Sequence, residues 1–148
     1  MELSLKGRAR LTHLNLRTEY HGEEKALGVD LRLVLATDAD DLVHFGAALK
    51  SLLYDNGNLR LPYLKPLQLT CEFEDHVLHI ADLSFDGVTF RRFAITAEAE
   101  ARIEVAFNAS ISDLELDALP RLGEMLLEEL VSVDIEAAQG ELFGAEAA

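Results

Sequence analysis

Alternation of apolar and polar residues is the feature that most restricts how this chain can fold. It is clearest between Val29 and Leu35 and between Ile103 and Ile111, where every second side chain is apolar or small. Successive side chains of a β-strand point to opposite faces, so a period of two predicts strands that bury one face and expose the other. We therefore expect a fold built around antiparallel β-sheet.

The same period marks other strands along the chain. A first strand begins with Leu3 and Leu5, and its phase slips near His13, which predicts a bulge or tight bend at that point. A turn is expected at 74–75, and the connection at 97–101 is either a turn or a bend in one long strand. The remaining expected strands cover residues 67–73, 77–80, 88–97 and 131–136.

Two segments change to a helical period. Residues 40–54 predict one amphipathic helix, whose start Asp38 or Asp40 can cap and which ends at Asp55-Asn56-Gly57. Asp117 is expected to cap a second helix, with Pro120 in its first turn. The predicted fold is mainly β (α+β), an antiparallel β-sandwich or partly open barrel of about seven strands with two helices. Residues 1–136 are expected to form a single globular domain and 137–148 a mobile acidic tail.

The net charge of −14 is concentrated in the second half of the chain. Residues 1–70 hold nine acids and nine bases, whereas residues 71–148 hold eighteen acids and four bases. Acidic surfaces repel nucleic-acid phosphates and anionic lipids. This charge predicts a solubilising surface, or a patch that meets a basic partner or imitates nucleic acid.

Composition also bears on the compartment. Cys71 is the single cysteine, which excludes an intrachain disulfide and is typical of a reducing cytoplasm. The first residues lack the apolar core of a signal peptide, and no run approaches the roughly 18 apolar residues of a membrane span. We expect a cytoplasmic protein that does not enter a membrane.

Motifs for catalysis, cofactors or metals do not stand out in the sequence. His76 and His79 would lie on opposite faces of a strand, and Cys71 shares the phase of its apolar neighbours. The glycines are scattered and form no phosphate-binding loop. The sequence therefore predicts a non-enzymatic protein with no metal and no cofactor.

Basic residues aligned on two strands are the main candidates for binding. The predicted nucleic-acid-binding residues are Lys6, Arg8, Arg10, Arg91 and Arg92. Arg91 and Arg92 lie between Phe90 and Phe93, and basic grooves beside aromatic side chains hold single-stranded nucleic acid in β-barrels. The alternative is a solvent face paired to acids on neighbouring strands. Two observations argue against a surface for base stacking. The sequence contains no tryptophan, and Phe90 and Phe93 would lie on opposite faces of a regular strand.

The stretch 14–33 contains the sequence LNLRTEYHGEEK followed by Val-Asp-Leu-Arg-Leu. It resembles an uncharacterised family of bacteriophage and prophage proteins, with a strand, a His-Gly-acid-acid loop and a second strand containing an aspartate. The resemblance implies a phage or prophage origin and a host-cytoplasm setting, and it carries over no functional residue. His21, Gly22, Glu23 and Glu24 are interpreted as a loop-shaping element, because glycine permits a tight turn, and secondarily as a ligand site.

These observations favour a non-enzymatic, phage-derived binding module that serves phage DNA metabolism by binding single-stranded DNA. Two alternatives stay open. One is an acidic adaptor or inhibitor that imitates nucleic acid and binds a basic host or phage protein, and the other is a virion or assembly component. Homo-oligomers are also expected if strand edges are left open.

Overall fold

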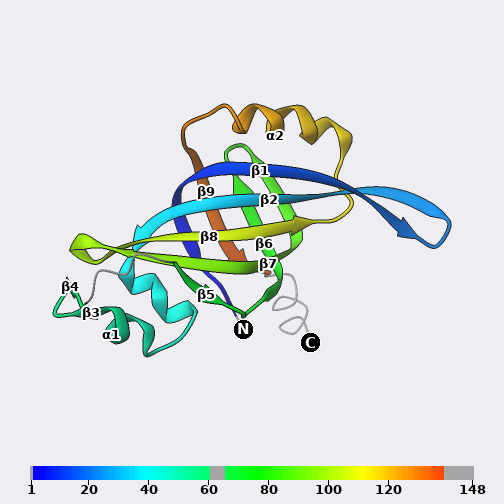
Figure 1. The fold of residues 1–148 in the computed structure, drawn as a ribbon. Coiled ribbons are helices and arrows are strands. Elements are labelled where there is room, and N and C mark those ends of the chain that lie inside the picture. The colour runs from blue at the N-terminus through cyan, green and yellow to red at the C-terminus, as the bar shows by residue number, and fades with distance from the viewer. Residues whose placement is uncertain (1, 61–65, 139–148) are drawn as a thin grey trace, which may run out of the picture.

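The computed structural model describes residues 2–60 and 66–138, and its main feature is a seven-stranded antiparallel sheet. Its strands are β1 (Leu5–His21), β2 (Glu24–Asp38), β5 (Leu67–Leu69), β6 (Phe73–Ile80), β7 (Leu83–Glu98), β8 (Arg102–Ile111) and β9 (Val131–Ala137). They follow the order β5-β7-β6-β9-β1-β2-β8, and β7 also pairs with β8, so the sheet curls round as a partly open barrel (Figure 1). The predicted mainly β fold is confirmed.

The inside of this curl is the hydrophobic core. The apolar positions of β2 and β8, including Leu31, Leu33 and Phe107, are fully buried, which confirms the predicted alternation. Phe93 stacks on Phe107 and meets the edge of the Phe73 ring, with ring centroids 5.8 and 5.6 Å apart. Burying a side chain of this size contributes roughly 1.5–3 kcal/mol, so the paired faces of the sheet stabilise one another through this cluster.

Two bulges bring the sequence pattern into phase with the sheet. Between Leu11 and His13 the register of β1 against β2 shifts, where the sequence predicts a bulge or bend. A second shift occurs in β7 between Arg91 and Ala94, where Arg92 adopts a φ of 57°. Phe90 and Phe93 would lie on opposite faces of a regular strand. Because of this bulge, both side chains are buried in the core.

The predictions for β5 and β6 need correction. The expected turn at 74–75 is a bulge inside the continuous strand β6, with Asp75 at a φ of 56°. The expected strand over 67–73 is interrupted at 70–72, so its two parts pair with different stretches of β7. Within β6, His76 is buried, and its Nε2 accepts a hydrogen bond from the backbone N–H of Leu3 at 2.8 Å. That bond anchors the start of the chain to β6.

The prediction of one helix over 40–54 is wrong. This segment forms a 3-10 helix, η1 (Ala39–His44), and a short helix, α1 (Leu49–Leu53). The backbone N–H of Phe45 donates to the carbonyl of Leu42 at the end of η1. Gly46 follows at the break, and glycine disfavours a helix because its backbone is flexible. Asn56-Gly57 is the turn of a small hairpin, β3 (Tyr54–Asp55) and β4 (Asn58–Leu59), so it does not end a long helix.

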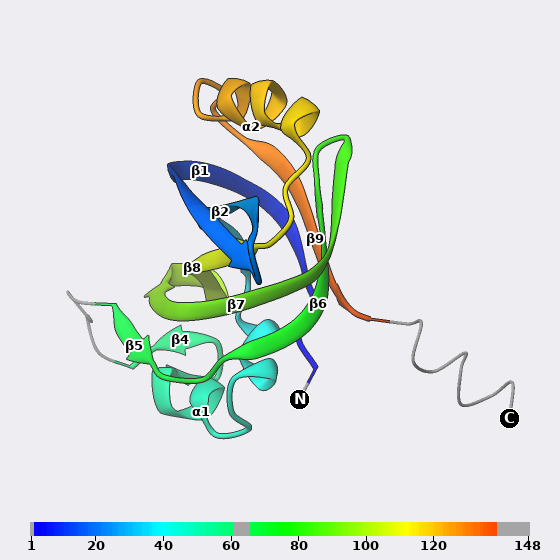
Figure 2. The same cartoon turned by 90° about the vertical axis from the view of Figure 1, so that its right-hand side faces the viewer.

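The second predicted helix exists but begins differently. It consists of a 3-10 turn, η3 (Leu116–Ala118), that leads into α2 (Leu119–Met125), with Pro120 in the first turn as expected. The residue at the N-cap is Ala118, and it makes no side-chain capping bond, so Asp117 is not the cap. Figure 2 shows α2 at one end of the barrel and α1 with β3 and β4 at the other, which leaves the outer face of β1, β2, β8 and β7 uncovered.

The remaining connections are short. A 3-10 turn, η2 (Ala99–Ala101), joins β7 to β8, with Glu100 and Ala101 at positive φ, so the two strands form a hairpin. The predicted tail starts inside β9, because Ala137 pairs with His76, and residues 139–148 lie outside the described part. No helix in residues 2–60 and 66–138 is long and apolar enough to cross a bilayer.

Candidate functional site

A polar groove lies on the outer face of the sheet, opposite the core. Two adjoining hollows of about 550 and 660 Å³ make up this groove, and they share Asn15, Asp30, Arg92 and Asn108 in their walls. It extends from β1 across β2 and β8 to β7. We call this site the arginine groove and define it by Asn15, Arg17, Asp30, Arg32, Arg91, Arg92, Asn108 and Ser110.

The strand register explains why these side chains converge. Arg32 on β2 is directly opposite Asn108 on β8, and Asn108 is in turn opposite Arg91 on β7. Directly opposed residues of an antiparallel pair project from the same face, so one row of polar positions crosses three strands. Asp30 and Ser110 form the next row of the same face.

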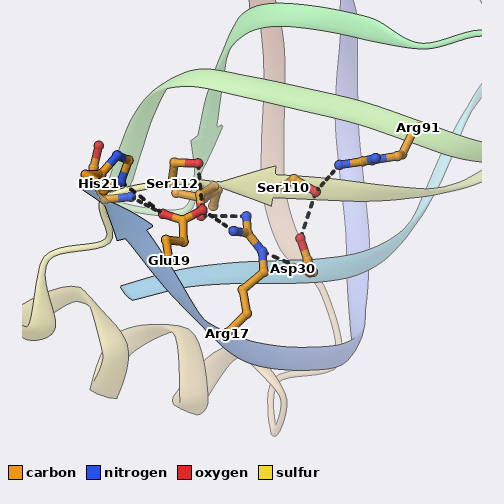
Figure 3. Close-up of polar contacts among 9 residues, drawn as sticks. Arg17, Glu19, His21, Asp30, Arg91, Ser110 and Ser112 are labelled. Atoms are coloured by element: carbon orange, nitrogen blue, oxygen red, sulfur yellow. Dashed lines mark hydrogen bonds and ion pairs between the residues drawn. The ribbon is translucent and has the colours of Figure 1, made fainter. Parts of the chain in front are cut away.

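Arg17 is the one arginine of the groove that is bound to carboxylates. Its Nε lies 3.2 Å from Oδ2 of Asp30, and its Nη1 is paired with Glu19 (Figure 3). Asp30 also accepts a 2.7 Å hydrogen bond from the hydroxyl of Ser110. Arg17 is therefore shared by two carboxylates and, together with Asp30, forms the floor of the groove.

Arg32, Arg91 and Arg92 make no ion pair with any described residue. Nη1 of Arg32 donates to the backbone carbonyl of Arg92 at 2.7 Å and to Oδ1 of Asn108 at 3.0 Å, which fixes the orientation of the guanidinium. Nη2 of Arg91 is 3.3 Å from the hydroxyl of Ser110. Arg32 and Arg91 are thus held by neutral partners, and the charges of all three arginines are available to an anion.

The electrostatic surroundings of Arg32 also favour a bound anion. Burial, together with the nearby positive charge of Arg92, lowers the pKa of Arg32 below that of a free guanidinium. Because an arginine keeps its proton at neutral pH even so, the protein holds two like charges close together there. An anion placed between them would relieve that repulsion.

The structure divides the basic residues predicted from sequence into two groups. Arg91 and Arg92 lie in the arginine groove, whereas Lys6 and Arg8 line a separate hollow beside β9. Lys6 is 4.0 Å from Asp134 in that hollow, and Arg10 lines neither cavity. The two phenylalanines that flank Arg91 and Arg92 are buried, so they offer no surface for base stacking.

Four polar residues of the groove were not predicted from the sequence as binding residues: Arg17, Arg32, Asn15 and Asn108. The signal was present in part, since each occupies a polar position of an alternating strand. What the sequence did not contain was the strand order, which sets β2 between β1 and β8. The bulge at Arg92 was equally hidden, because arginine rarely adopts positive φ.

The predicted loop element 21–24 is a tight hairpin turn between β1 and β2. Gly22 has a φ of 68°, as the first residue of a two-residue turn, while His21 and Glu24 already belong to the strands. Nε2 of His21 lies 3.2 Å from Asp113 and 4.0 Å from Glu19, so three potential metal ligands gather there.

Hydrogen bonds occupy the carboxylate of Glu19. Its Oε1 accepts from the backbone N–H of Asp113 and its Oε2 from Ser112 and Arg17 (Figure 3). Burial alone would raise the pKa of Glu19, but these hydrogen bonds and the charge of Arg17 outweigh it and hold the pKa below its usual value. The cluster ties the β1–β2 hairpin to the exit of β8.

No family model, curated protein or solved structure matches this chain. The resemblance of residues 14–33 to phage proteins consequently stays a prediction. The arginine groove is interpreted from its own geometry and charge.

Proposed function

We propose that this protein is a non-enzymatic binding module that holds single-stranded DNA by its phosphates in the arginine groove. The observation that carries the proposal is the set of three arginines without a carboxylate partner, Arg32, Arg91 and Arg92, along one open groove. Guanidinium groups fit phosphate oxygens in a fork geometry, and a row of them follows a sugar–phosphate chain. A phage origin and a host-cytoplasm setting belong to the same proposal.

The rest of the groove suits a strand of nucleic acid that is bound without base stacking. Asn15, Gln68 and Asn108 supply amide groups, which donate to phosphates and accept from base edges. Phenylalanine, tyrosine and tryptophan are absent from the described walls of the groove, so little preference among bases is expected.

Binding is favoured over catalysis because of the state of Asp30, the carboxylate in the floor of the groove. Both of its oxygens are engaged, one by Arg17 and the other by Ser110. A general base must be free to accept a proton from a substrate, and Asp30 is not. The groove thus offers positive charge and hydrogen-bond donors, which are the requirements of a phosphate ligand.

The experiment is a titration of fluorescently labelled oligothymidine with the whole protein at several salt concentrations. Three phosphate contacts predict a slope of log K against log salt of about −2, from roughly −0.7 for each contact on a single strand. The double variant Arg91→Glu/Arg92→Glu should abolish binding, since it replaces two of the three free cations with anions.

The matched control is Lys6→Glu/Arg8→Glu, which makes the same change in net charge in the separate hollow beside β9. We expect it to reduce affinity only through the long-range field. Equal losses in the two double variants would contradict a site in the groove. A wild-type protein that binds no oligonucleotide would contradict the proposal itself and favour the acidic adaptor.

A further inference from the structure

The outer edge of β1 is open along most of its length. β1 pairs with β9 only from Leu5 to Ala9, while it pairs with β2 from Arg8 to His21. From Arg10 onward, the edge facing away from β2 has no strand partner in the described part of the chain. Figure 1 shows the turn end of the β1–β2 hairpin reaching beyond the rest of the sheet, so the edge is accessible there.

The hairpin geometry shows which residues present their backbone to the open edge. A two-residue turn makes His21 and Glu24 a hydrogen-bonded pair, and such pairs alternate with pairs whose N–H and C=O groups point outward. Leu14, Leu16 and Thr18 are therefore among the residues that offer a donor and an acceptor at the edge. Leu16 and Tyr20 also expose 49% and 66% of their surface, an unusual amount for apolar and aromatic strand residues.

We propose that this edge pairs with the same edge of a second copy, antiparallel and about a two-fold axis, with Leu16 opposite the partner subunit's Leu16. Open, apolar strand edges are templates for another strand, and a two-fold operator makes one patch complementary to itself. In this register the two exposed Leu16 side chains cover one another, and Leu14 is opposite the partner subunit's Thr18.

Charge favours this register over one of its neighbours. It sets Glu19 opposite the partner subunit's His13, and Arg17 opposite the partner subunit's Asn15. Sliding one strand by two residues in one direction would place Arg17 opposite the partner subunit's Arg17. Like charges directly opposite each other are unfavourable. The chosen register also brings the partner subunit's acidic turn at Glu23 next to Arg10, a cation with no ion pair in the described residues.

A second copy suits this edge better than other surfaces of a chain with a charge of −14. Between Arg10 and His21 the strand holds two arginines and one acid, so two copies meet here with little of the repulsion that the acidic second half would cause. A two-fold axis perpendicular to the sheet keeps the outer faces on one side. In a consequence that rests on the proposed function, the dimer would present two arginine grooves to one DNA strand.

Sedimentation equilibrium of the whole chain without DNA tests the proposal. The wild-type protein should be a dimer, and Leu16→Lys should be a monomer with an unchanged circular-dichroism spectrum, because a lysine on an edge strand blocks pairing. The control is Leu52→Lys, which places the same charge at an apolar residue of α1 that is 54% exposed, and it should stay dimeric. A monomeric wild type, or a dimeric Leu16→Lys variant, would overturn the inference.

Cross-linking tests the register. Opposed residues of a hydrogen-bonded antiparallel pair have Cα atoms about 5.5 Å apart, which a disulfide spans. In a Cys71→Ser background, Leu16→Cys should form covalent dimers under mild oxidation, whereas Leu52→Cys should not. A dimer in which Leu16→Cys does not cross-link would overturn the proposed pairing. Because no DNA is present, these results are independent of whether the groove binds it.

Discussion

At the scale of single residues, Arg92 combines backbone strain with an unpaired charge. Its φ of 57° lies in the left-handed region, which costs a residue with a side chain roughly 1–2 kcal/mol. Strain of this kind persists where the surrounding structure fixes it and is common at binding sites. The bulge turns both Arg91 and Arg92 outward while Phe90 and Phe93 stay in the core.

The variant Arg92→Gly separates these two properties. Glycine adopts positive φ without a steric cost, so the free energy of unfolding should stay the same or rise by up to about 1 kcal/mol, while the affinity for oligothymidine falls. Urea unfolding and the salt titration measure the two effects. Asp75→Gly is the control, since Asp75 has the same backbone strain in the β6 bulge away from the groove, and it should leave affinity unchanged. Unaltered DNA binding by Arg92→Gly would remove Arg92 from the site.

Glu19 predicts a pH dependence of stability. Its pKa is lower in the folded protein than its ordinary value of 4.5, so the ionised form is stabilised by folding. That contribution is fully present above pH 4.5 and is lost as the pH falls toward the folded pKa. Wild type should be more stable than Glu19→Gln at neutral pH, and the difference should narrow as the pH drops below 4.5. Urea titrations at a series of pH values measure it, and a difference that grows on acidification would contradict the account.

At the scale of elements, the alternating pattern predicts the long strands because burial of one face dominates their energetics. The predicted limits of β8 and β9 agree closely with the structure, whereas β2 extends beyond the predicted 29–35 at both ends. The bulge at Arg92 could not be predicted, since arginine rarely adopts positive φ, whereas the sequence predicted a break at Asp75 but as a turn between two strands. The groove was predicted only in part because the bulge at Arg92 could not be predicted, and because strand order is a property of the whole sheet.

The bulge in β1 allows a test of register with two deletions. Thr12 is the extra residue between Leu11 and His13, so its removal keeps the apolar residues on the inner face. Deletion of Asn15, in a regular part of β1, would turn every residue on one side of it to the wrong face. The Thr12 deletion should unfold cooperatively with a modest loss of stability, whereas the Asn15 deletion should not fold. Circular dichroism during heating distinguishes them, and equal tolerance of both would contradict the assigned register.

At the scale of the whole molecule, cations without a carboxylate partner gather on one face of an acidic protein. The chain carries a net charge of −14, yet Arg32, Arg91 and Arg92 line one groove, where Asp30 is held by Arg17. The surrounding negative field would weaken non-specific contacts with DNA everywhere else. Specific placement of a strand in the groove is thus compatible with an acidic protein.

The central claim, that the arginine groove is the binding site, is tested most directly by amide chemical-shift mapping. The isotopically labelled protein is titrated with oligothymidine, and the shifts of β2, β7 and β8 are compared with those of β9. We expect the largest changes at Arg32, Arg92 and Asn108, with little change at Ser132 or Asp134 beside the second hollow. Changes centred on Ser132 and Asp134, or no changes at all, would contradict the account.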